Sequence, residues 1–352
     1  MVPRNPLRSR RGLTLLIAGL GVLVALAVAI AVPVPYVALF PGPTLNTLGA
    51  VRGQPLIQVT GRRVYPTDGN LNLVTVSSQG GPPPNGIDIF AALRAWLSPH
   101  NAVVPQSEIF TPGQTQQQVV QEDTEQMVSS QQTAQAAAFC QLGIPFRVVD
   151  TVQALVPGKP ADGVLRKGDV IGAVDGTPVT CKHDAASLIR ARKPGAAVQL
   201  TISRGGHRQT VHLTTVNVQG EAVVGVQVAE TFAFPFPVKF SLGEKIGGPS
   251  AGMMFALGII DKLTPGSLTD GKFIAGTGEI EADGAVDPIG GIQQKMVGAR
   301  DAGATIFLTP AANCADTAGA VPAGLRLVKV STLSGALSDL AALRKGQPVP
   351  SC

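Results

Sequence analysis

An uncharged apolar run near the N-terminus constrains the fold of this chain most. Residues 13–32 contain no charged residue and no proline over 20 consecutive positions. At about 1.5 Å per residue, a helix of this length spans the roughly 30 Å hydrocarbon core of a bilayer. Four arginines precede the run and no basic residue follows it closely. Because positive residues favour the cytoplasmic side, we expect a cytoplasmic basic tail at residues 1–12, a single-pass anchor in the cell membrane at 13–32, and an extracytoplasmic remainder.

Two alternatives to a retained anchor stay open. Residues 27–29 and 29–31 have the small-x-small spacing of a signal-peptide cleavage site. A buried core helix is the other alternative, since apolar runs also occur inside soluble domains.

The charge distribution argues against a nucleic-acid partner. The net charge is +5, but after the four N-terminal arginines the chain carries 24 basic and 23 acidic residues. A nucleic-acid surface requires a basic patch and often stacked aromatic side chains, whereas aromatic residues make up only 4% of this chain. With 352 residues, 45% of them hydrophobic, we expect about two folded domains.

The chain contains four cysteines, at positions 140, 181, 314 and 352, and no CxxC motif. With only four histidines, we expect no zinc site and no other metal site. Outside the cytoplasm four cysteines can form two disulfides in three connectivities. We favour Cys140–Cys181 with Cys314–Cys352, because each bond would then stay within one predicted domain; free buried thiols are the alternative.

The remaining pattern predicts alternating helices and strands. Residues 33–49 are rich in Pro and Gly and read as an extended segment leaving the membrane. A long polar helix is expected over 115–142, because this stretch lacks Pro and Gly and ends at Gly143. Further helices are expected at 87–97, 184–192, 250–263, 292–302 and 332–343, and further strands at 71–76, 222–228, 236–240, 273–277, 306–308 and 325–330.

The segment GGPSAG at 247–252 opens an apolar helical run and carries the most informative serine. Backbone N–H groups at a helix N-terminus have no intrahelical partner and favour negative charge. Such groups can stabilise the oxyanion formed when a serine attacks a carbonyl. Ser250 is therefore a candidate nucleophile; the alternative is a helix N-cap.

The base for Ser250 is expected to be a lysine. All four histidines precede Ser250, which excludes the serine–acid–histidine order of an α/β-hydrolase. Lys262 lies 12 positions along the same helix, which is about 18 Å away. Lys295 follows a double glycine at the start of a helix with uncharged neighbours, where burial can lower its pKa. Lys329, inside an apolar strand, is the weaker rival.

No nucleotide or cofactor is predicted. Residues 266–272 have P-loop spacing, but Phe273 stands where a P-loop has Ser or Thr. The segment before Gly266 also reads as a helix, whereas a P-loop follows a strand.

Three blocks in order resemble the proteolytic domain of Lon proteases. They are GGPSAG at 247–252, AGTGEIEADGAVDPIGGIQQK at 275–295, which contains the TGEI and PIGG motifs, and AGATIFLTP at 302–310. The resemblance implies that Ser250 is the nucleophile and Lys295, 45 positions later, the general base. It also implies that Thr277 helps to hold the lysine. Gly248, Pro249 and Ala251 would form the backbone segment around the oxyanion.

A second resemblance covers residues 144–216. The run VPGKPADGVLRKGDVIGAVDGTPV at 156–179 resembles bacterial PDZ domains, which bind an extended peptide at a sheet edge. The whole arrangement is similar to bacterial membrane-anchored, PDZ-containing Lon-like proteases. Two departures stand out: no AAA+ module is recognised, and Gly247 replaces the acidic residue that many Lon enzymes carry before GPSAG.

These resemblances imply a mixed α/β (α+β) chain with an N-terminal transmembrane helix. We expect a linker, strand and Gln-rich helix at 33–143, a PDZ-like β-rich module with one or two helices at 144–216, a Lon-type α/β protease domain at 217–345 and a tail at 346–352. Strand 71–76 is also able to pair with the C-terminal domain, which would make the PDZ module an insertion.

The expected activity is ATP-independent serine endopeptidase activity on unfolded or tail-presented envelope proteins, which the PDZ domain selects. A hexameric ring is implied by resemblance alone. The alternatives are a catalytically silent membrane-anchored adaptor and an enzyme that needs a separate ATPase.

Overall fold

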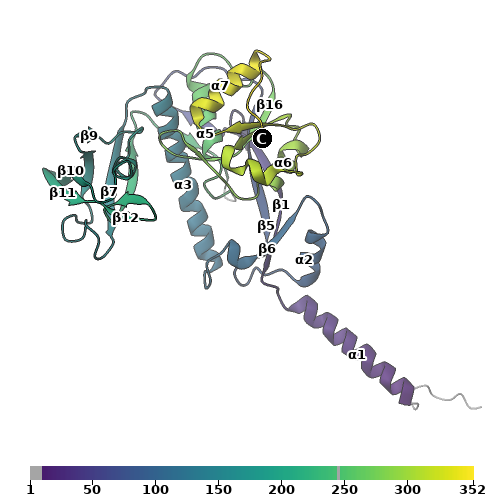
Figure 1. The fold of residues 1–352 in the computed structure, drawn as a ribbon. Coiled ribbons are helices and arrows are strands. Elements are labelled where there is room, and N and C mark those ends of the chain that lie inside the picture. The colour runs from purple at the N-terminus through teal and green to yellow at the C-terminus, as the bar shows by residue number, and fades with distance from the viewer. Residues whose placement is uncertain (1–9, 244–245) are drawn as a thin grey trace, which may run out of the picture.

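A computed structural model describes residues 10–243 and 246–352. Helix α1 (Arg10–Ala31) projects from the rest of the chain (Figure 1). Its segment Gly12–Ala31 is long and apolar enough to cross a membrane, and none of its most apolar window is buried. The alternative of a buried core helix is therefore wrong.

One of the two six-stranded sheets joins strands from both ends of the chain. Its order is β20-β19-β16-β5-β1-β6. The four strands from β20 to β5 run parallel, and β1 is antiparallel to both β5 and β6. The strands are β1 (Tyr36–Asn46), β5 (Asn70–Gln79), β6 (Ala102–Pro105), β16 (Phe273–Gly276), β19 (Ile306–Pro310) and β20 (Arg326–Val330).

The expected extended segment at 33–49 is instead mostly a strand of this sheet. Pro41 and Pro43 lie where the β1–β5 register shifts, between Pro41 and Thr44. Prolines cannot donate to a sheet ladder and usually argue against an interior strand. The register shift accommodates them here, so β1 pairs on both sides of an irregular stretch.

Helices cover both faces of this sheet. Helix α5 (Gly252–Leu263) is almost wholly buried on one face, where Leu73 and Leu308 belong to its core cluster. Helix α6 (Ile292–Asp301) covers the other face, where Val74 and Phe307 pack with it. Neighbouring residues of one strand thus point to opposite faces, as the two-residue repeat of a strand requires.

Helix α3 (Gln116–Gln141) packs along α5. It begins with a capping box formed by Thr115 and Gln118, and its chain leaves through Gly143 in the left-handed region. Its first half is mostly exposed, whereas residues 134–139 are buried. The predicted long polar helix is confirmed, with an apolar C-terminal half that docks on the core.

The second main sheet has its own hydrophobic core. Its order is β11-β10-β8-β7-β14, with β9 paired to β8. Val152, Leu200 and Ile202 are among the core residues, and helix α4 (Ala185–Arg190) packs on it. The strands are β7 (Arg147–Leu155), β8 (Val170–Val174), β9 (Thr177–Pro178), β10 (Ala197–Arg204), β11 (His207–Thr214) and β14 (Val226–Ala233). This sheet therefore continues past residue 216, where the sequence analysis placed the module's end.

Each sheet is the centre of one module: the larger module contains the sheet from β20 to β6, and the second module contains the sheet from β11 to β14. Further elements complete them. Helix α7 (Leu333–Arg344) is capped by Thr332, and helix α2 (Ile89–Trp96) by Asp88. The short strands and 3₁₀ helices are β2 (Ala50–Val51), β3 (Gln54–Pro55), β4 (Ile57–Val59), η2 (Gln106–Glu108), β12 (Val216–Val218), β13 (Glu221–Val223), β15 (Val238–Phe240), β17 (Glu279–Ile280), β18 (Val286–Asp287) and η3 (Ala311–Thr317).

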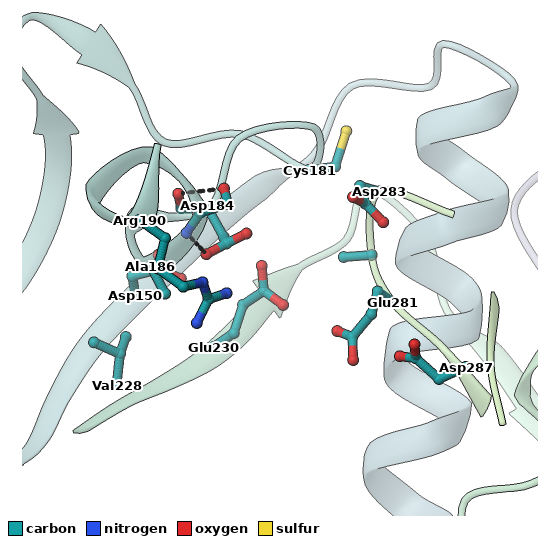
Figure 2. A pocket seen from close by; sticks show the side chains of 12 residues that line it. Asp150, Cys181, Asp184, Ala186, Arg190, Val228, Glu230, Glu281, Asp283 and Asp287 are labelled. Carbon is teal, nitrogen blue, oxygen red and sulfur yellow. Dashed lines mark hydrogen bonds between the residues drawn. The ribbon is translucent and has the colours of Figure 1, made fainter. Parts of the chain in front are cut away.

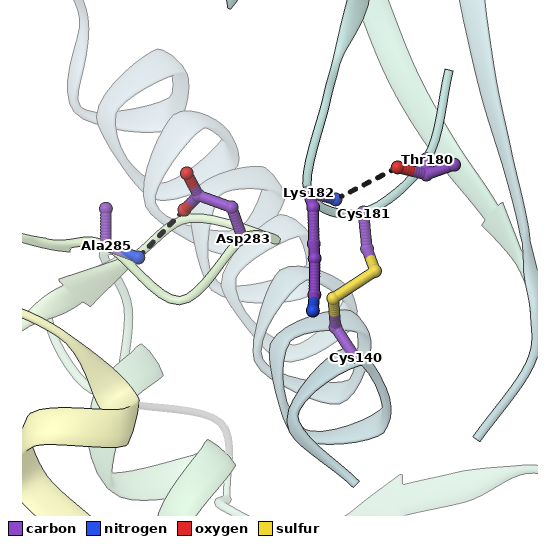
Figure 3. Close-up of a disulfide and its surroundings, with 6 residues drawn as sticks. All are labelled: Cys140, Thr180, Cys181, Lys182, Asp283 and Ala285. Atoms are coloured by element: carbon purple, nitrogen blue, oxygen red, sulfur yellow. Dashed lines mark hydrogen bonds between the residues drawn. A yellow bond between two sulfur atoms is a disulfide. The ribbon is translucent and has the colours of Figure 1, made fainter. Parts of the chain in front are cut away.

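The cysteines form the predicted pairs. Cys314–Cys352 fastens the expected C-terminal tail to the larger module. Cys140–Cys181 joins the end of α3 to the loop before α4 (Figure 3). The Cys140–Cys181 bond therefore connects the two modules, whereas the sequence analysis expected it to stay within one domain.

Candidate active site

Ser250 lies in the turn that leads into helix α5. The N-cap of α5 is Ala251, and no side chain makes a capping hydrogen bond there. Gly248 adopts a positive φ of 82°, which glycine tolerates best. Ser250 is half-buried and does not act as a helix cap, so the N-cap alternative is wrong.

Thr277 fixes the backbone beneath Ser250. This threonine follows β16 and is fully buried. Its Oγ1 donates to the carbonyl oxygen of Ser250 at 2.9 Å, and the amide of Gly278 donates to the same oxygen at 2.9 Å. The amide of Met253 returns a bond to the Gly278 carbonyl at 3.0 Å. The nucleophile turn is thus tied to the segment after β16 in both directions.

Lys295 is buried next to Thr277. It sits in the first turn of α6 and only 3% of its surface is exposed. Its Nζ donates to Thr277 Oγ1 at 3.1 Å. Among the residues that the structure describes, no carboxylate forms an ion pair with it. Burial therefore lowers the pKa of Lys295 from 10.5 to about 7.

The start of α6 needs a glycine to reach this position. Gly291, the N-cap, adopts a φ of 67°, and a Cβ there would lie 2.7 Å from a methyl group of Val76. Gly291 thus lets the first turn of α6 lie close to β5. Helix N-termini also disfavour a cation, which adds to the reasons for Lys295 to be neutral.

The arrangement can supply a neutral amine beside a serine. An uncharged lysine can accept a proton near neutral pH, as the base of a Ser–Lys pair does. No hydrogen bond joins Ser250 Oγ to Lys295 Nζ within residues 10–243 and 246–352. Catalytic hydrogen bonds often tighten only when substrate binds.

Helix α3 braces the nucleophile turn from the other side. Ser130 Oγ donates to the carbonyl of Pro249 at 2.8 Å, and the Gly248 amide donates to the carbonyl of Asp123 at 3.0 Å. A Cβ on Gly247 would lie 2.6 Å from the Cβ of Asp123. Sequence reasoning missed Asp123 and Ser130, because nothing in a polar helix more than 110 positions away signals this contact.

Gly247 leaves room for Asp123, which brings a carboxyl group beside the turn from α3. Burial, and then the neighbouring Glu122, raise the pKa of Asp123.

The expected oxyanion segment is partly engaged by protein groups. The Gly248 amide already has the Asp123 carbonyl as its acceptor, and Pro249 has no N–H. Within the described residues, the amides of Ser250 and Ala251 donate to no backbone acceptor. These two amides are therefore the donors available to a developing oxyanion.

The side chains that could compete with Lys295 as a base lie away from Ser250. Lys262 Nζ donates to the carbonyl of Leu48 at 3.4 Å, and Lys329 is exposed on β20. Lys272 of the P-loop-like segment pairs with Asp270 at 2.9 Å, and the preceding residues form helix α5. The four histidines are all exposed. In the described chain, no three or more His, Cys, Asp or Glu side chains are arranged so that they could hold a metal ion.

An apolar groove runs along the outer strand of the second sheet. Among the described strands, β14 has only β7 as a neighbour in the sheet, so its other edge is unpaired by them. A cavity of about 380 Å³ lies between β14 and α4, lined by Val226, Val228 and Ile189.

An acidic cleft of about 430 Å³ adjoins this groove and lies between the two modules (Figure 2). Val228 and Arg190 line both cavities. Arg190 is the one basic residue among those that line the cleft. Burial, and then nearby carboxylates, raise the pKa of Glu230 to about 8. The six carboxylates that line the cleft are Asp150, Asp184 and Glu230 from the second module and Glu281, Asp283 and Asp287 from the larger one.

Comparisons with known proteins assign both modules. The PDZ domain family matches residues 128–215, and the Lon protease (S16) C-terminal proteolytic domain matches residues 245–340. Lon protease of Azospirillum brasilense is 32% identical over 158 residues, covering 39% of this chain and 19% of that protein. Lon protease 1 of Sorangium cellulosum is 40% identical over 100 residues, covering 28% and 12%.

Other similarities concern shorter stretches. A probable periplasmic serine endoprotease DegP-like of Pseudomonas fulva is 42% identical over 59 residues, covering 17% of this chain and 12% of that protein. The solved PDZ domain of the SdrC-like protein of Listeria monocytogenes covers 22% of this chain and 85% of its own, at 21% identity and a TM-score of 0.21.

The chain spans less than a fifth of the length of each of these curated relatives. The matched segments nevertheless include Ser250, Thr277 and Lys295 within the Lon match. The protein thus combines an N-terminal apolar helix and a PDZ domain with a serine peptidase domain of the Lon type.

Proposed function

We propose that this protein is an ATP-independent serine endopeptidase whose nucleophile is Ser250 and whose general base is Lys295. The observation that carries the proposal is a buried lysine that has no ionic partner among the described residues. It is hydrogen-bonded to Thr277, which in turn holds the backbone of Ser250. Burying a lysine without a counter-charge is costly for folding. Such a group is typical of sites that need a neutral base.

The reaction follows from these positions. Neutral Lys295 takes the proton of Ser250 Oγ as this oxygen attacks the peptide carbonyl. The amides of Ser250 and Ala251 stabilise the oxyanion. Lys295 then protonates the leaving amine, which leaves an acyl-enzyme, and afterwards removes a proton from the water that hydrolyses it. Thr277 is a positioning residue that aims Lys295.

Substrate selection is assigned to the edge of β14. PDZ domains bind a peptide by adding it as a strand to a sheet edge, and β14 offers an unpaired edge beside an apolar cavity. We propose that unfolded segments or tails of envelope proteins bind there. Helix α1 spans the cell membrane in this proposal, with the basic tail in the cytoplasm and both domains outside. A homo-oligomeric ring stays a prediction from resemblance.

The acidic cleft adds a charge preference to this selection. A strand added to β14 beside Val228 reaches Glu230 and the cleft. Asp150 in the cleft is 2% exposed, and its Oδ1 has no partner within the described chain. Peptides with lysines next to an apolar end should therefore bind more tightly than matched peptides with glutamates, which fluorescence anisotropy would measure. Equal affinities would contradict the charge preference alone.

The test of the proposed activity is cleavage of unfolded casein by the full chain in detergent, without ATP. Ser250→Ala and Lys295→Ala should each abolish cleavage. Ser129→Ala and Lys329→Ala are the matched controls, since both residues are exposed away from the site. Equal cleavage by all variants would overturn the dyad, and a wild-type protein without activity would favour the silent adaptor.

A further inference from the structure

Helix α2 has an unusual distribution of apolar side chains. It buries Ala92 and Ala95 against the larger module, so its inner face is made of small residues. Its large apolar side chains point outward instead. The exposed fractions are 45% for Phe90, 47% for Leu93, 67% for Trp96 and 75% for Leu97 at its C-cap.

These outward side chains form one continuous stripe. At about 100° per residue, Trp96, Leu93, Leu97 and Phe90 fall within an arc of about 120° on the helix surface. Exposed Arg94 lies at the border of the arc. A soluble surface helix normally turns such a stripe toward its core, whereas α2 turns it away from the protein.

The position of α2 indicates what covers this stripe. Val34, three residues beyond the end of α1, forms an antiparallel bridge with Ile87, two residues before α2. Helix α2 also contacts α1 (Figure 1). The stripe is thus held close to the point where the apolar helix α1 ends. A bilayer around α1 would have its interfacial region at this level.

We propose that α2 lies in the outer interfacial region of the membrane and docks the protease module on the lipid surface through Phe90, Leu93, Trp96 and Leu97. The inference rests on the proposed membrane-spanning role of α1. Interfacial helices bury an apolar face about 5–10 Å into the boundary of headgroups and acyl chains. Tryptophan is enriched at this depth, and an arginine at the border of the face can extend its charged end to the headgroups.

Such docking gives the module a second attachment besides α1. Two attachment points, α1 and α2, restrict how the module tilts above the bilayer. The active site and the β14 groove are then presented to substrates at a defined height, rather than swinging on one linker.

The chain offers a built-in reporter, because Trp96 is its single tryptophan. The experiment uses the full chain in phosphatidylcholine nanodiscs, with lipids brominated on the upper part of the acyl chain as quenchers. We expect brominated lipid to quench Trp96 emission severalfold and aqueous acrylamide to quench it little. Leu93→Asp with Leu97→Asp should reverse both results, and since these side chains are exposed the substitutions should leave casein cleavage intact.

Two further variants make the outcome specific. Trp96→Phe with Ser338→Trp places the reporter on α7, and this tryptophan should be insensitive to brominated lipid. Trp96→Phe with Leu20→Trp places it in α1, where lipid quenching reports the proposed span. Lipid quenching of the tryptophan in α1 but not of Trp96 would overturn the docking of α2 and leave the membrane span standing. Absence of lipid quenching at both positions would overturn the span as well. Protection of Trp96 that depends on the number of copies per disc, without lipid quenching, would assign the stripe to a second copy and overturn the lipid proposal.

Discussion

Both modules bury ionisable side chains almost completely, and Asp169 of one module differs from Lys295 of the other in whether a counter-charge accompanies it. In the PDZ domain, Asp169 is 1% exposed and receives two hydrogen bonds from Arg204, at 2.7 and 2.8 Å, and one from the Arg166 amide at 2.8 Å. In the protease domain, Lys295 is 3% exposed, and among the described residues its amine bonds only to a neutral hydroxyl. Both groups are buried, but only the aspartate has a counter-charge.

The difference separates a structural charge from a functional one. Arg204 holds the pKa of Asp169 below its usual value, so the aspartate stays ionised and paired. Burial alone lowers the pKa of Lys295 to about 7. We therefore expect the pair on Asp169 to stabilise its domain, and the uncompensated Lys295 to destabilise its domain while serving as the proposed neutral base.

The largest expected effect comes from Lys295→Met, which should change activity and stability in opposite directions. Casein cleavage should fall by about 10³-fold or more. The unfolded lysine binds a proton up to pH 10.5 and the folded one only up to about pH 7. Folding is therefore penalised at every pH below 10.5, and most below 7. Removing the amine should raise the free energy of unfolding by up to about 4 kcal/mol near pH 7.

Chemical denaturation near neutral pH measures that change, with Lys329→Met as the exposed control. A less stable Lys295→Met protein would contradict the comparison.

Thr277→Val sharpens the comparison by removing the hydroxyl that bonds to the Lys295 amine. A hydrogen bond to a charged group contributes about 1.5–3 kcal/mol, so we expect kcat to fall by about 10–100-fold. The hydroxyl oxygen stabilises the ammonium form more than the neutral amine. Its loss should therefore move the midpoint of the pH–rate profile to lower pH. Thr277→Ser retains the hydroxyl and should restore both values, and failure of this rescue would argue against the positioning role.

Asp169→Asn tests the other side of the comparison. It leaves Arg204 without its counter-charge, and we expect the melting temperature of the PDZ domain to fall by about 5–10 °C. Differential scanning calorimetry measures this, while casein cleavage at a lower temperature should persist. An unchanged melting transition would show that the ion pair contributes no stability.

Ser130→Ala should have the smallest effect, because it removes one neutral hydrogen bond to the carbonyl of Pro249. We expect kcat to fall by about 2–10-fold with KM little changed. The neighbouring Ser129→Ala is the matched control, since Ser129 is exposed on the same helix. Equal kinetics of the two variants would mean that α3 does not brace the nucleophile turn.

The sequence predicted what lies in contiguous motifs and missed what depends on distant contacts. Ser250, Thr277 and Lys295 became candidates because three short blocks occur in a fixed order, and the structure brings Thr277 into contact with the other two residues, while their catalytic roles stay a prediction. The long helix before Gly143 was equally predictable from composition and its C-terminal glycine. Strand β1 was missed because its prolines mimic a linker. Asp123 was missed because its contact with Gly247 depends on how α3 packs on α5.

The most direct test of the proposed dyad is the pH dependence of kcat/KM for a short unstructured peptide, measured on the full chain. If buried, neutral Lys295 is the base for Ser250, the value should rise by about tenfold per pH unit in acid and level off above a midpoint of about 7. A rate that continues to climb past pH 9, toward the pKa of an ordinary lysine, or that does not change with pH, would contradict it.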